Sequence, residues 1–204
     1  MPLSSAGQKA GALPRRRPSH PLALFFKGFL KHPAMVGSVI PSSRALVDKM
    51  LAPVDWGRVK LFVEYGPGVG TYTQPILDRL GPDAQLIAID TNPDFVTFLR
   101  KELADPRLHV VRGSAADVRR IIGDFGHAQA DYVLSGLPFS TLPAGVGRRI
   151  AQETAAVLKT DGAFLVYQLS AKVVAFIAPH FARIERGFEW LNIPPMRLFW
   201  ARKG

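Results

Sequence analysis

The chain has 204 residues, enough for one domain of average size, and its hydrophobic fraction of 48% is normal for a globular protein with a substantial core. The absence of cysteine excludes disulfides, thiolate metal sites and cysteine catalysis, and the five histidines lack HxxxH or HExxH spacing, so no metal site is predicted. The net charge of +10 is uneven: residues 1–60 hold ten Lys/Arg against two acids, whereas residues 61–204 hold sixteen against fourteen. This asymmetry predicts that an anionic partner meets the N-terminal end.

The first 19 residues are rich in Pro, Gly, Ser, Ala and Arg and show no apolar periodicity, which is typical of a disordered basic arm. The lack of acids before Asp48 also fits a removable transit peptide. A secretory signal is not expected, because Lys27 and Lys31 interrupt the apolar run and no small-residue cleavage site follows.

Residues 20–31, HPLALFFKGFLK, form an apolar segment that is too short to span a membrane, which requires about 20 apolar residues. On a helical wheel its phenylalanines share one face and its lysines lie opposite. This pattern is typical of an amphipathic helix in the headgroup layer of an anionic bilayer, although such a helix can instead pack its apolar face on the core. The predicted membrane contacts are Phe25, Phe26, Lys27, Phe29 and Lys31.

From residue 61 onward, apolar strand patterns alternate with helical patterns. The expected strands are 61–66, 85–90, 108–113, 131–136 and 163–169, and the expected helices are 71–80, 94–103, 117–125 and 144–158. The alternation predicts an α/β fold with a parallel sheet covered on both faces. Residues 181–190 and 196–203 read as two further strands joined by a Pro-Pro turn, hence an antiparallel C-terminal pair.

A glycine loop follows the first expected strand, in the pattern E-x-G-x-G-x-G from Glu64 to Gly70. The dinucleotide fingerprint requires a third glycine at position 71, which is Thr71, so a nicotinamide or flavin site is not favoured. The motif resembles motif I of the Rossmann-like S-adenosylmethionine methyltransferases. Asp90 ends the second strand, where a carboxylate can accept hydrogen bonds from both ribose hydroxyls of a nucleoside. The structural alternative is a tight turn followed by an unrelated capping Asp.

The resemblance places the rest of the cofactor pocket after the third and fourth strands. Many relatives carry an acid directly after the glycine of the third loop, where it binds the adenine amine. Here Ser114 stands at that position and Asp117 is the nearest acid, so the adenine contact falls to the backbone or to Asp117. Ser114 can equally be a plain helix cap. The implied cofactor-binding residues are Glu64, Gly66, Gly68, Gly70, Thr71, Asp90, Thr91, Gly113, Ser114, Ala115 and Ser135.

The motif after the fourth strand separates the methyltransferase classes. Adenine and glutamine methyltransferases often carry Asn/Asp-x-Pro-Tyr/Phe there, and the amide oxygen accepts a proton from the substrate amine. Here the tetrapeptide begins with Gly136 and ends with Phe139, so the polar side chain is missing. Ser135, Gly136 and Leu137 are the residues expected to position the reacting groups.

Three further segments, 31–50, 135–143 and 189–203, resemble the bacterial phospholipid N-methyltransferases, and the resemblance spans about residues 24–203. It rests mainly on the runs Gly-Ser-Val-Ile-Pro-Ser-Ser and Trp-x-Asn-x-Pro-Pro. It implies a mostly parallel seven-stranded sheet in residues 59–204, and membrane-binding and cofactor-lid helices in residues 20–58. Ser42 or Ser43 is placed to cap the lid helix.

The same resemblance implies stepwise methylation of phosphatidylethanolamine toward phosphatidylcholine, with S-adenosyl-L-methionine (SAM) converted to S-adenosyl-L-homocysteine. It implies a peripheral enzyme on the cytoplasmic face of the cell membrane that uses neither metal nor nucleic acid. Candidate substrate contacts are Phe139, Arg148, Trp190, Asn192 and Arg197. Aromatic faces suit a methylated ammonium and arginines suit a lipid phosphate.

Tyr65, Tyr167 and His180 are candidate proton acceptors, among which the sequence does not choose. Two other functions stay open. One is an RNA adenine-N6 methyltransferase, disfavoured by Gly136 and by the N-terminal concentration of charge. The other is a non-catalytic membrane-binding module, disfavoured by the intact glycine loop and Asp90.

Overall fold

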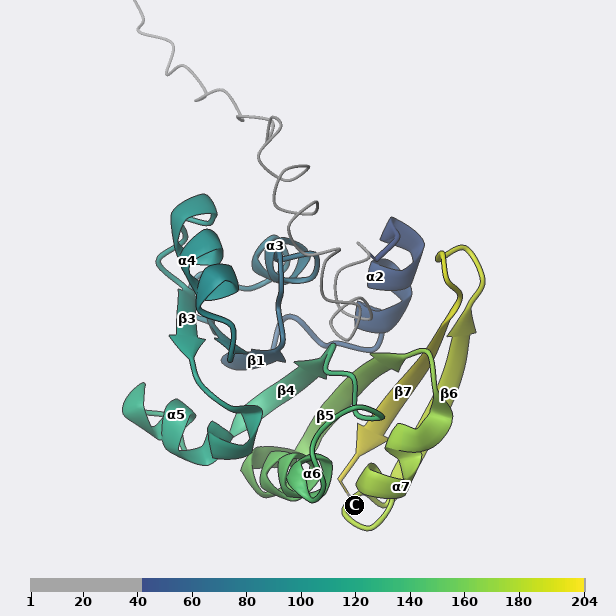
Figure 1. Cartoon of the computed structure of the whole chain (residues 1–204). Coiled ribbons are helices and arrows are strands. Elements are labelled where there is room, and N and C mark those ends of the chain that lie inside the picture. The colour runs from purple at the N-terminus through teal and green to yellow at the C-terminus, as the bar shows by residue number, and fades with distance from the viewer. Residues whose placement is uncertain (1–41, 204) are drawn as a thin grey trace, which may run out of the picture.

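The computed structural model describes residues 42–203, and its centre is a seven-stranded sheet with the order β3-β2-β1-β4-β5-β7-β6 (Figure 1). The strands are β1 (Leu61–Tyr65), β2 (Gln85–Asp90), β3 (Leu108–Arg112), β4 (Ala130–Ser135), β5 (Leu158–Gln168), β6 (Arg183–Glu189) and β7 (Met196–Arg202). The first five are parallel, and β7 pairs antiparallel with both β5 and β6. The predicted Rossmann-like fold is confirmed. The predicted basic arm and amphipathic helix lie outside the described residues.

Helices cover both faces of the sheet (Figure 1). They are α2 (Arg44–Leu51), α3 (Thr73–Leu77), α4 (Pro93–Glu102), α5 (Val118–Asp124), α6 (Val146–Val157) and α7 (Val174–Ile177), with short 3-10 helices η2 (Ala115–Asp117) and η3 (Ala171–Val173). Two main clusters of buried residues lie on either side, one shared with α5 and α6 and the other with α2 and α3. All five residues of β1 are buried for this reason, which explains why that strand is apolar apart from Glu64.

Most elements begin or end within two residues of their predicted bounds, and two differ more. The helix expected over 71–80 is limited to Thr73–Leu77, and the strand expected over 163–169 begins already at Leu158. The added part of β5 pairs with Ala130 through a shift in register, an irregularity that the apolar pattern does not encode.

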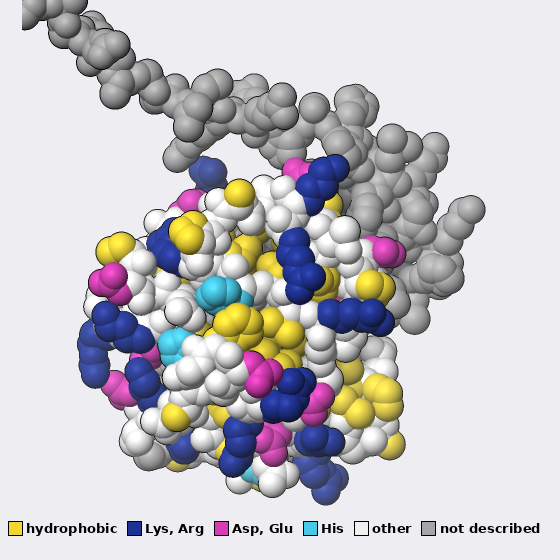
Figure 2. Space-filling model, turned by 90° about the vertical axis from the view of Figure 1, so that its left-hand side faces the viewer, with side chains coloured by type: hydrophobic (Ala, Val, Ile, Leu, Met, Phe, Trp, Pro, Cys, Tyr) yellow, Lys and Arg dark blue, Asp and Glu magenta, His cyan; other side chains and the backbone are white. Residues whose placement is uncertain are grey.

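Cationic and acidic side chains are interspersed over the face that α4, β3 and α5 form (Figure 2). The chain from residue 42 onward holds 20 Lys/Arg and 16 acids, whereas residues 1–41 hold six Lys/Arg and no acid. The body of the domain is therefore of mixed charge, and the basic excess lies mainly in the N-terminal segment.

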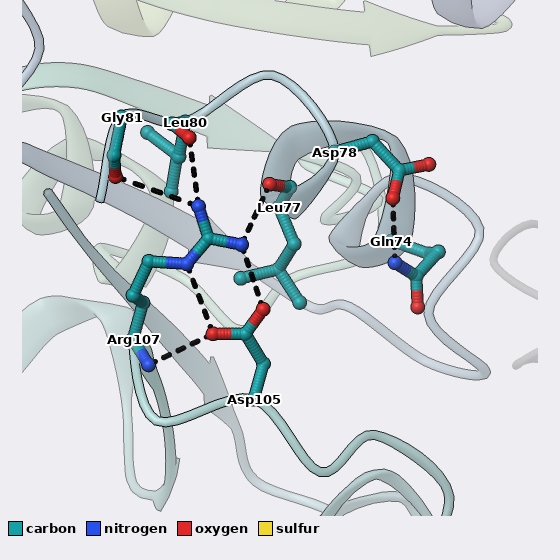
Figure 3. Close-up of polar contacts among 7 residues, drawn as sticks. All are labelled: Gln74, Leu77, Asp78, Leu80, Gly81, Asp105 and Arg107. Atoms are coloured by element: carbon teal, nitrogen blue, oxygen red, sulfur yellow. Dashed lines mark hydrogen bonds and ion pairs between the residues drawn. The ribbon is translucent and has the colours of Figure 1, made fainter. Parts of the chain in front are cut away.

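Arg107 fastens the end of α3 to the loop before β3 (Figure 3). Its guanidinium donates to the carbonyl oxygens of Leu77, Leu80 and Gly81 at 3.0, 2.7 and 3.4 Å and to both carboxylate oxygens of Asp105. The hydrogen bonds from Arg107 hold the pKa of Asp105 below its usual value. A cation satisfies carbonyls here that a helix C-terminus leaves unpaired, so the short α3 ends at a defined place.

The described end of the first of the two runs most specific to the resemblance, Ser42 and Ser43, lies against the second run. Ser43 caps α2 by accepting from Leu46 N, and its own amide donates to Asn192 Oδ1 at 2.7 Å. Lys49 donates to the carbonyl of Phe188 at 2.6 Å and pairs with Glu189. Asn192 is only 4% exposed, so this predicted substrate contact instead anchors α2 to the turn between β6 and β7.

Candidate functional site

The glycine loop between β1 and α3 lies at the carboxyl edge of the sheet, where the loops after β2 and β4 also gather. Gly66, Gly68 and Gly70 have φ of 65°, 55° and 83°, a backbone region that favours glycine. A Cβ atom at Gly66 would lie 2.9 Å from Leu137 Cδ2, and one at Gly70 would lie 2.8 Å from Leu99 Cδ2. The loop therefore needs glycine for both conformation and space.

Glu64 is buried on β1, and its Oε2 accepts a hydrogen bond of 2.7 Å from Thr73 Oγ1 at the start of α3. Burial raises the pKa of Glu64 to about 8, the bond from Thr73 opposes this, and the charge of Asp90 raises it further. The carboxyl therefore holds a proton near neutral pH until a cation is placed beside it. Thr73 had no role in the sequence-based predictions.

This raised pKa predicts an unusual dependence of stability on pH. Between the ordinary pKa of 4.5 and the folded pKa of about 8, the folded protein binds more protons at Glu64 than the unfolded chain does. The stabilisation is complete at low pH and is lost as the pH rises through about 8. We expect the free energy of unfolding to fall by about 2–4 kcal/mol relative to Glu64→Gln between about pH 5 and pH 8.5. Urea denaturation of both proteins across that range measures the difference, and parallel curves would contradict it.

Asp90 ends β2 and is 9% exposed. Its Oδ1 accepts from Asn92 N at 2.9 Å and its Oδ2 accepts from Gly68 N at 3.3 Å, so it joins the loop after β2 to the glycine loop. Burial raises the pKa of Asp90, and the backbone bonds from Asn92, Gly68 and Thr91 oppose the shift. Asn92 caps α4 by accepting from Asp94 N, so Asp90 itself is not the side chain that caps the helix.

The loop after β3 is held against Asp90, because Gly113 N donates to the Asp90 carbonyl at 2.9 Å. Ser114 caps η2 by accepting from Ala116 N, which bears out the cap interpretation of this serine. Asp117 pairs with Arg149 at 3.1 Å, so its carboxylate already has a cationic partner. The side chains of Ser114 and Asp117 thus both have partners within the protein.

The loop after β4 contains an interaction that the sequence does not show. Ser135 is fully buried, and its Oγ accepts from Leu137 N at 3.2 Å. A Cβ atom at Gly136 would lie 2.2 Å from the hydroxyl oxygen of Tyr167 on β5. The phenol therefore fills the space that a side chain at position 136 would need, which is the position of the missing amide.

Tyr167 is stacked on Tyr72, with ring centroids 4.7 Å apart and the rings inclined by 27°. Burial raises the pKa of both tyrosines, and the nearby Glu64 raises both further. Both phenols are therefore neutral at physiological pH. Tyr72, directly before α3, was not predicted from sequence, and no motif marks it.

The other two candidate proton acceptors lie elsewhere. Tyr65 is fully buried and its hydroxyl hydrogen bonds with Thr154 Oγ1 on α6 at 3.1 Å. His180 lies between α7 and the start of β6, and β6 starts opposite Arg202 at the amino edge of the parallel strands. The hypothesis that either accepts the substrate proton is therefore not supported. Tyr65 also ends its strand at the carboxyl edge, but its hydroxyl is bonded to α6, so Tyr167 is the one of the three whose hydroxyl lies against Gly136.

An apolar groove of about 350 Å³ opens beside the loop after β4. Phe139 contributes to its wall, although this side chain is 2% exposed and its ring packs on Phe164 and Phe176. One cation, Lys172, stands at the groove among small and apolar residues. The lining residues are Phe139, Ser140, Leu142, Pro143, Ala144, Gly145, Gly147, Lys172, Ala175 and Phe176.

The remaining predicted substrate contacts do not converge on one place. Arg148 is exposed on α6, and Arg197 is exposed on β7 with its guanidinium carbon 5.6 Å from the centroid of the Phe188 ring. Trp190 is 74% exposed in the turn between β6 and β7. Its ring lies 4.2 Å from Phe188, so Trp190 and Arg197 flank one aromatic side chain.

The residues at this edge fit SAM. The glycine backbone permits close approach of a ligand, and the buried acids Glu64 and Asp90 suit a cationic ligand that carries ribose hydroxyls. Within residues 42–203, no group of His, Cys, Asp and Glu has the geometry of a metal site. The same residues include no helix long and apolar enough to cross a bilayer.

Comparison with solved structures supports the same fold. A precorrin-6y C5,15-methyltransferase from Geobacter metallireducens matches with a TM-score of 0.59 and 17% identity, over 78% of this chain and 87% of that one. A T. thermophilus 16S rRNA methyltransferase, solved with AdoMet and guanosine, matches with a TM-score of 0.59 and 18% identity, over 79% of this chain and 43% of that one. At such identities the likeness concerns the fold alone.

Sequence comparison is more specific. Residues 62–162 match the methyltransferase domain family. The ribosomal RNA small subunit methyltransferase H of Methylorubrum populi is 35% identical over 48% of this chain, but only 28% of that protein is covered. The ornithine lipid N-methyltransferase of Singulisphaera acidiphila is 32% identical over 88% of this chain and 94% of that protein. The chain therefore belongs to the family of SAM-dependent methyltransferases that includes this ornithine lipid N-methyltransferase.

Proposed function

We propose that this protein transfers methyl groups from SAM to the amine of a membrane lipid, and that phosphatidylethanolamine and its mono- and dimethyl products are the substrates. The observation that carries the proposal is the neutral phenol of Tyr167 at the position of the missing amide. The same loop after β4 continues into the wall of an apolar groove. The similarity to an ornithine lipid N-methyltransferase supports an aminolipid substrate.

The carboxyl edge of the sheet would hold the cofactor. The glycine loop and Glu64 would face its methionine part, Asp90 and Thr91 its ribose, and Gly113 to Ala115 its adenine. When bound, SAM supplies a methyl carbon to the nitrogen lone pair and leaves as S-adenosyl-L-homocysteine, with the C–S electron pair kept on sulfur. The chain's own task is to hold the amine in line with that carbon.

Tyr167 would orient the amine. A neutral phenol oxygen can accept a hydrogen bond from an N–H group. Because its pKa is raised, the phenol of Tyr167 stays protonated at neutral pH and does not take the substrate proton. A lipid ammonium has an ordinary pKa of about 10 and must lose a proton to water before it attacks. Desolvation by the apolar wall of the groove favours that loss. Ser135 and Leu137 fix the loop that carries Gly136, by their own hydrogen bond of 3.2 Å.

The lipid would approach from a membrane to which the protein binds peripherally, on its cytoplasmic face. The groove after β4 has room for the first carbons of an acyl chain or for the glycerol, and Lys172 is placed for a phosphate. The proposed membrane contacts remain Phe25, Phe26, Lys27, Phe29 and Lys31. The proposed headgroup contacts remain the aromatic face of Trp190 and the charges of Arg148 and Arg197.

The substrate can be identified with methyl-labelled SAM. Vesicles of phosphatidylethanolamine with anionic lipid should yield labelled mono-, di- and trimethyl lipids on thin-layer plates, and anionic lipid should raise the rate because the N-terminal segment is basic. Vesicles containing ornithine lipid and a structured ribosomal RNA serve as parallel substrates. Label in ornithine lipid alone would reassign the lipid, and label in RNA alone would favour an adenine-N6 methyltransferase. No transfer despite tight SAM binding would favour a non-catalytic module.

A further inference from the structure

The turn between β6 and β7, residues 190–195, has its polar and apolar side chains in an inverted arrangement. Glu189 and Asn192 are 7% and 4% exposed, whereas Trp190, Leu191 and Ile193 are 74%, 75% and 84% exposed. Surface turns of soluble proteins normally place polar groups outward, and a cluster of exposed large apolar residues marks an interaction site.

Hydrogen bonds hold this arrangement in place. Leu191 N donates to Glu189 Oε1 at 2.9 Å, and Asn192 Nδ2 donates to the carbonyl of Pro194 at 2.8 Å. Asn192 Oδ1 accepts from Ser43 N, and Lys49 pairs with Glu189, so α2 supports the turn from inside. The polar groups are engaged in this scaffold, whereas Trp190, Leu191 and Ile193 stay exposed, and the ring of Trp190 contacts that of Phe188.

The turn stands beside α2, at the carboxyl edge of the sheet (Figure 1). Gly136 and Tyr167, the proposed methyl-transfer site, lie at the same edge. Arg197 at the start of β7 pairs in register with Gln168, the residue after Tyr167. Leu169 follows and is 53% exposed. Among residues 42–203, the exposed large hydrophobic side chains are Leu169, Trp190, Leu191 and Ile193, and all four lie at this edge.

We propose that this turn, together with Leu169, is a second membrane-insertion element, separate from residues 20–31, which seats the carboxyl edge of the sheet on the bilayer. The proposal deepens the proposed function and rests on a lipid substrate. Exposed cations border the apolar cluster: Arg197 beside Phe188, and Lys172 three residues after Leu169. Tryptophan with neighbouring cations suits the interface of an anionic bilayer, which favours a membrane over a protein partner. Insertion would bring the groove after β4 and Tyr167 to the level of the lipid headgroups.

The test uses the full chain and vesicles of phosphatidylethanolamine and phosphatidylglycerol. The variant Trp190→Ser/Leu191→Ser/Ile193→Ser should partition into vesicles about tenfold or more weakly than the wild type, because it loses three apolar anchors. The matched control Trp190→Phe/Leu191→Met/Ile193→Leu keeps the apolar character and should bind within about twofold of wild type. Phe25→Asp/Phe29→Asp, compared alone and combined with the serine variant, separates the contribution of the N-terminal segment.

Fluorescence gives a direct readout at the turn. Vesicles should shift the emission of Trp190 to the blue, brominated lipid should quench it, and Trp190→Phe should abolish both effects. The proposal would be overturned if the serine variant sedimented with vesicles as the wild type does, or if the Trp190 emission did not change when vesicles were added. A vesicle-independent blue shift with a doubled mass would also overturn it, because the cluster would then be an interface between two copies.

Activity on short-chain lipid in detergent separates this proposal from the proposed function. The double variant Leu191→Ser/Ile193→Ser, which keeps the proposed headgroup contact Trp190, should retain SAM affinity and this activity, while its rate on vesicles falls. Loss of lipid methylation by every protein, wild type included, would contradict the proposed function and leave the vesicle-binding result standing on its own.

Discussion

Asp90→Ala should weaken SAM binding by about tenfold or more, since each charge-assisted hydrogen bond to a ribose hydroxyl is worth about 1.5–3 kcal/mol. The carboxylate is preorganised for this task, because it is held between Gly68 N and Asn92 N at the end of β2. Burial raises its pKa, so the cost of keeping the charge buried is partly met by those backbone donors before a ligand arrives.

Isothermal titration calorimetry measures this loss directly. Asp94→Ala is the matched control, because it removes the same charge from an exposed position four residues further on and should leave the affinity unchanged. Asp90→Asn keeps the shape and one acceptor and should bind with an intermediate affinity. An Asp90→Ala protein that is folded and binds SAM as the wild type does would contradict the ribose assignment.

Gly136→Ala should lower the methylation rate by about a hundredfold, because a displacement of about 1 Å in a group that positions the substrate can cost that much. The added Cβ would lie 2.2 Å from the hydroxyl oxygen of Tyr167 and 2.8 Å from its Cζ, so the phenol must move. Stacking on Tyr72 limits where it can go. Overpacking of this kind also costs about 1–3 kcal/mol of stability, so the variant should unfold at a lower temperature.

Two further proteins keep this prediction specific. Gly123→Ala in α5 adds the same methyl group where nothing lies within 4 Å, and its activity should match wild type. Tyr167→Phe removes only the hydroxyl, so it should preserve SAM affinity and fold while kcat falls by about tenfold or more. Gly136→Asn, which restores the amide of the adenine enzymes, should still be inactive because Tyr167 occupies the space. Full activity of Tyr167→Phe on the lipid would refute the role of the phenol.

Much of the fold follows from local chemistry that the sequence displays. Continuous apolar runs such as residues 163–167 are typical of strands buried on both faces, and the glycine loop, Asp90 and the serine caps are short-range patterns. The proximity of Glu64, the three loop glycines and Asp90 could be predicted for the same reason, because they stand at the ends of consecutive strands and parallel strands bring those ends together. Element ends were less predictable, since α3 ends where Arg107, 30 residues after Leu77, supplies its hydrogen bonds.

The substrate side of the site depends on contacts between residues far apart in the chain. Tyr167 meets Gly136 because β5 lies next to β4, and Tyr72 joins them through stacking. No periodicity encodes such a contact, so the sequence left Tyr65, Tyr167 and His180 equivalent.

Asn192 and Trp190 show the same division between sequence and tertiary structure. Their motif could be recognised, but only the structure turned Asn192 inward to Ser43 and Trp190 outward to solvent. The sequence by itself determined the sheet, the glycine loop and the two carboxylates of the candidate cofactor site, because these depend on local periodicity and on turns. The tertiary structure alone decided which tyrosine hydroxyl lies against Gly136 and which side chains face the surface, because burial and contacts across distant strands set both.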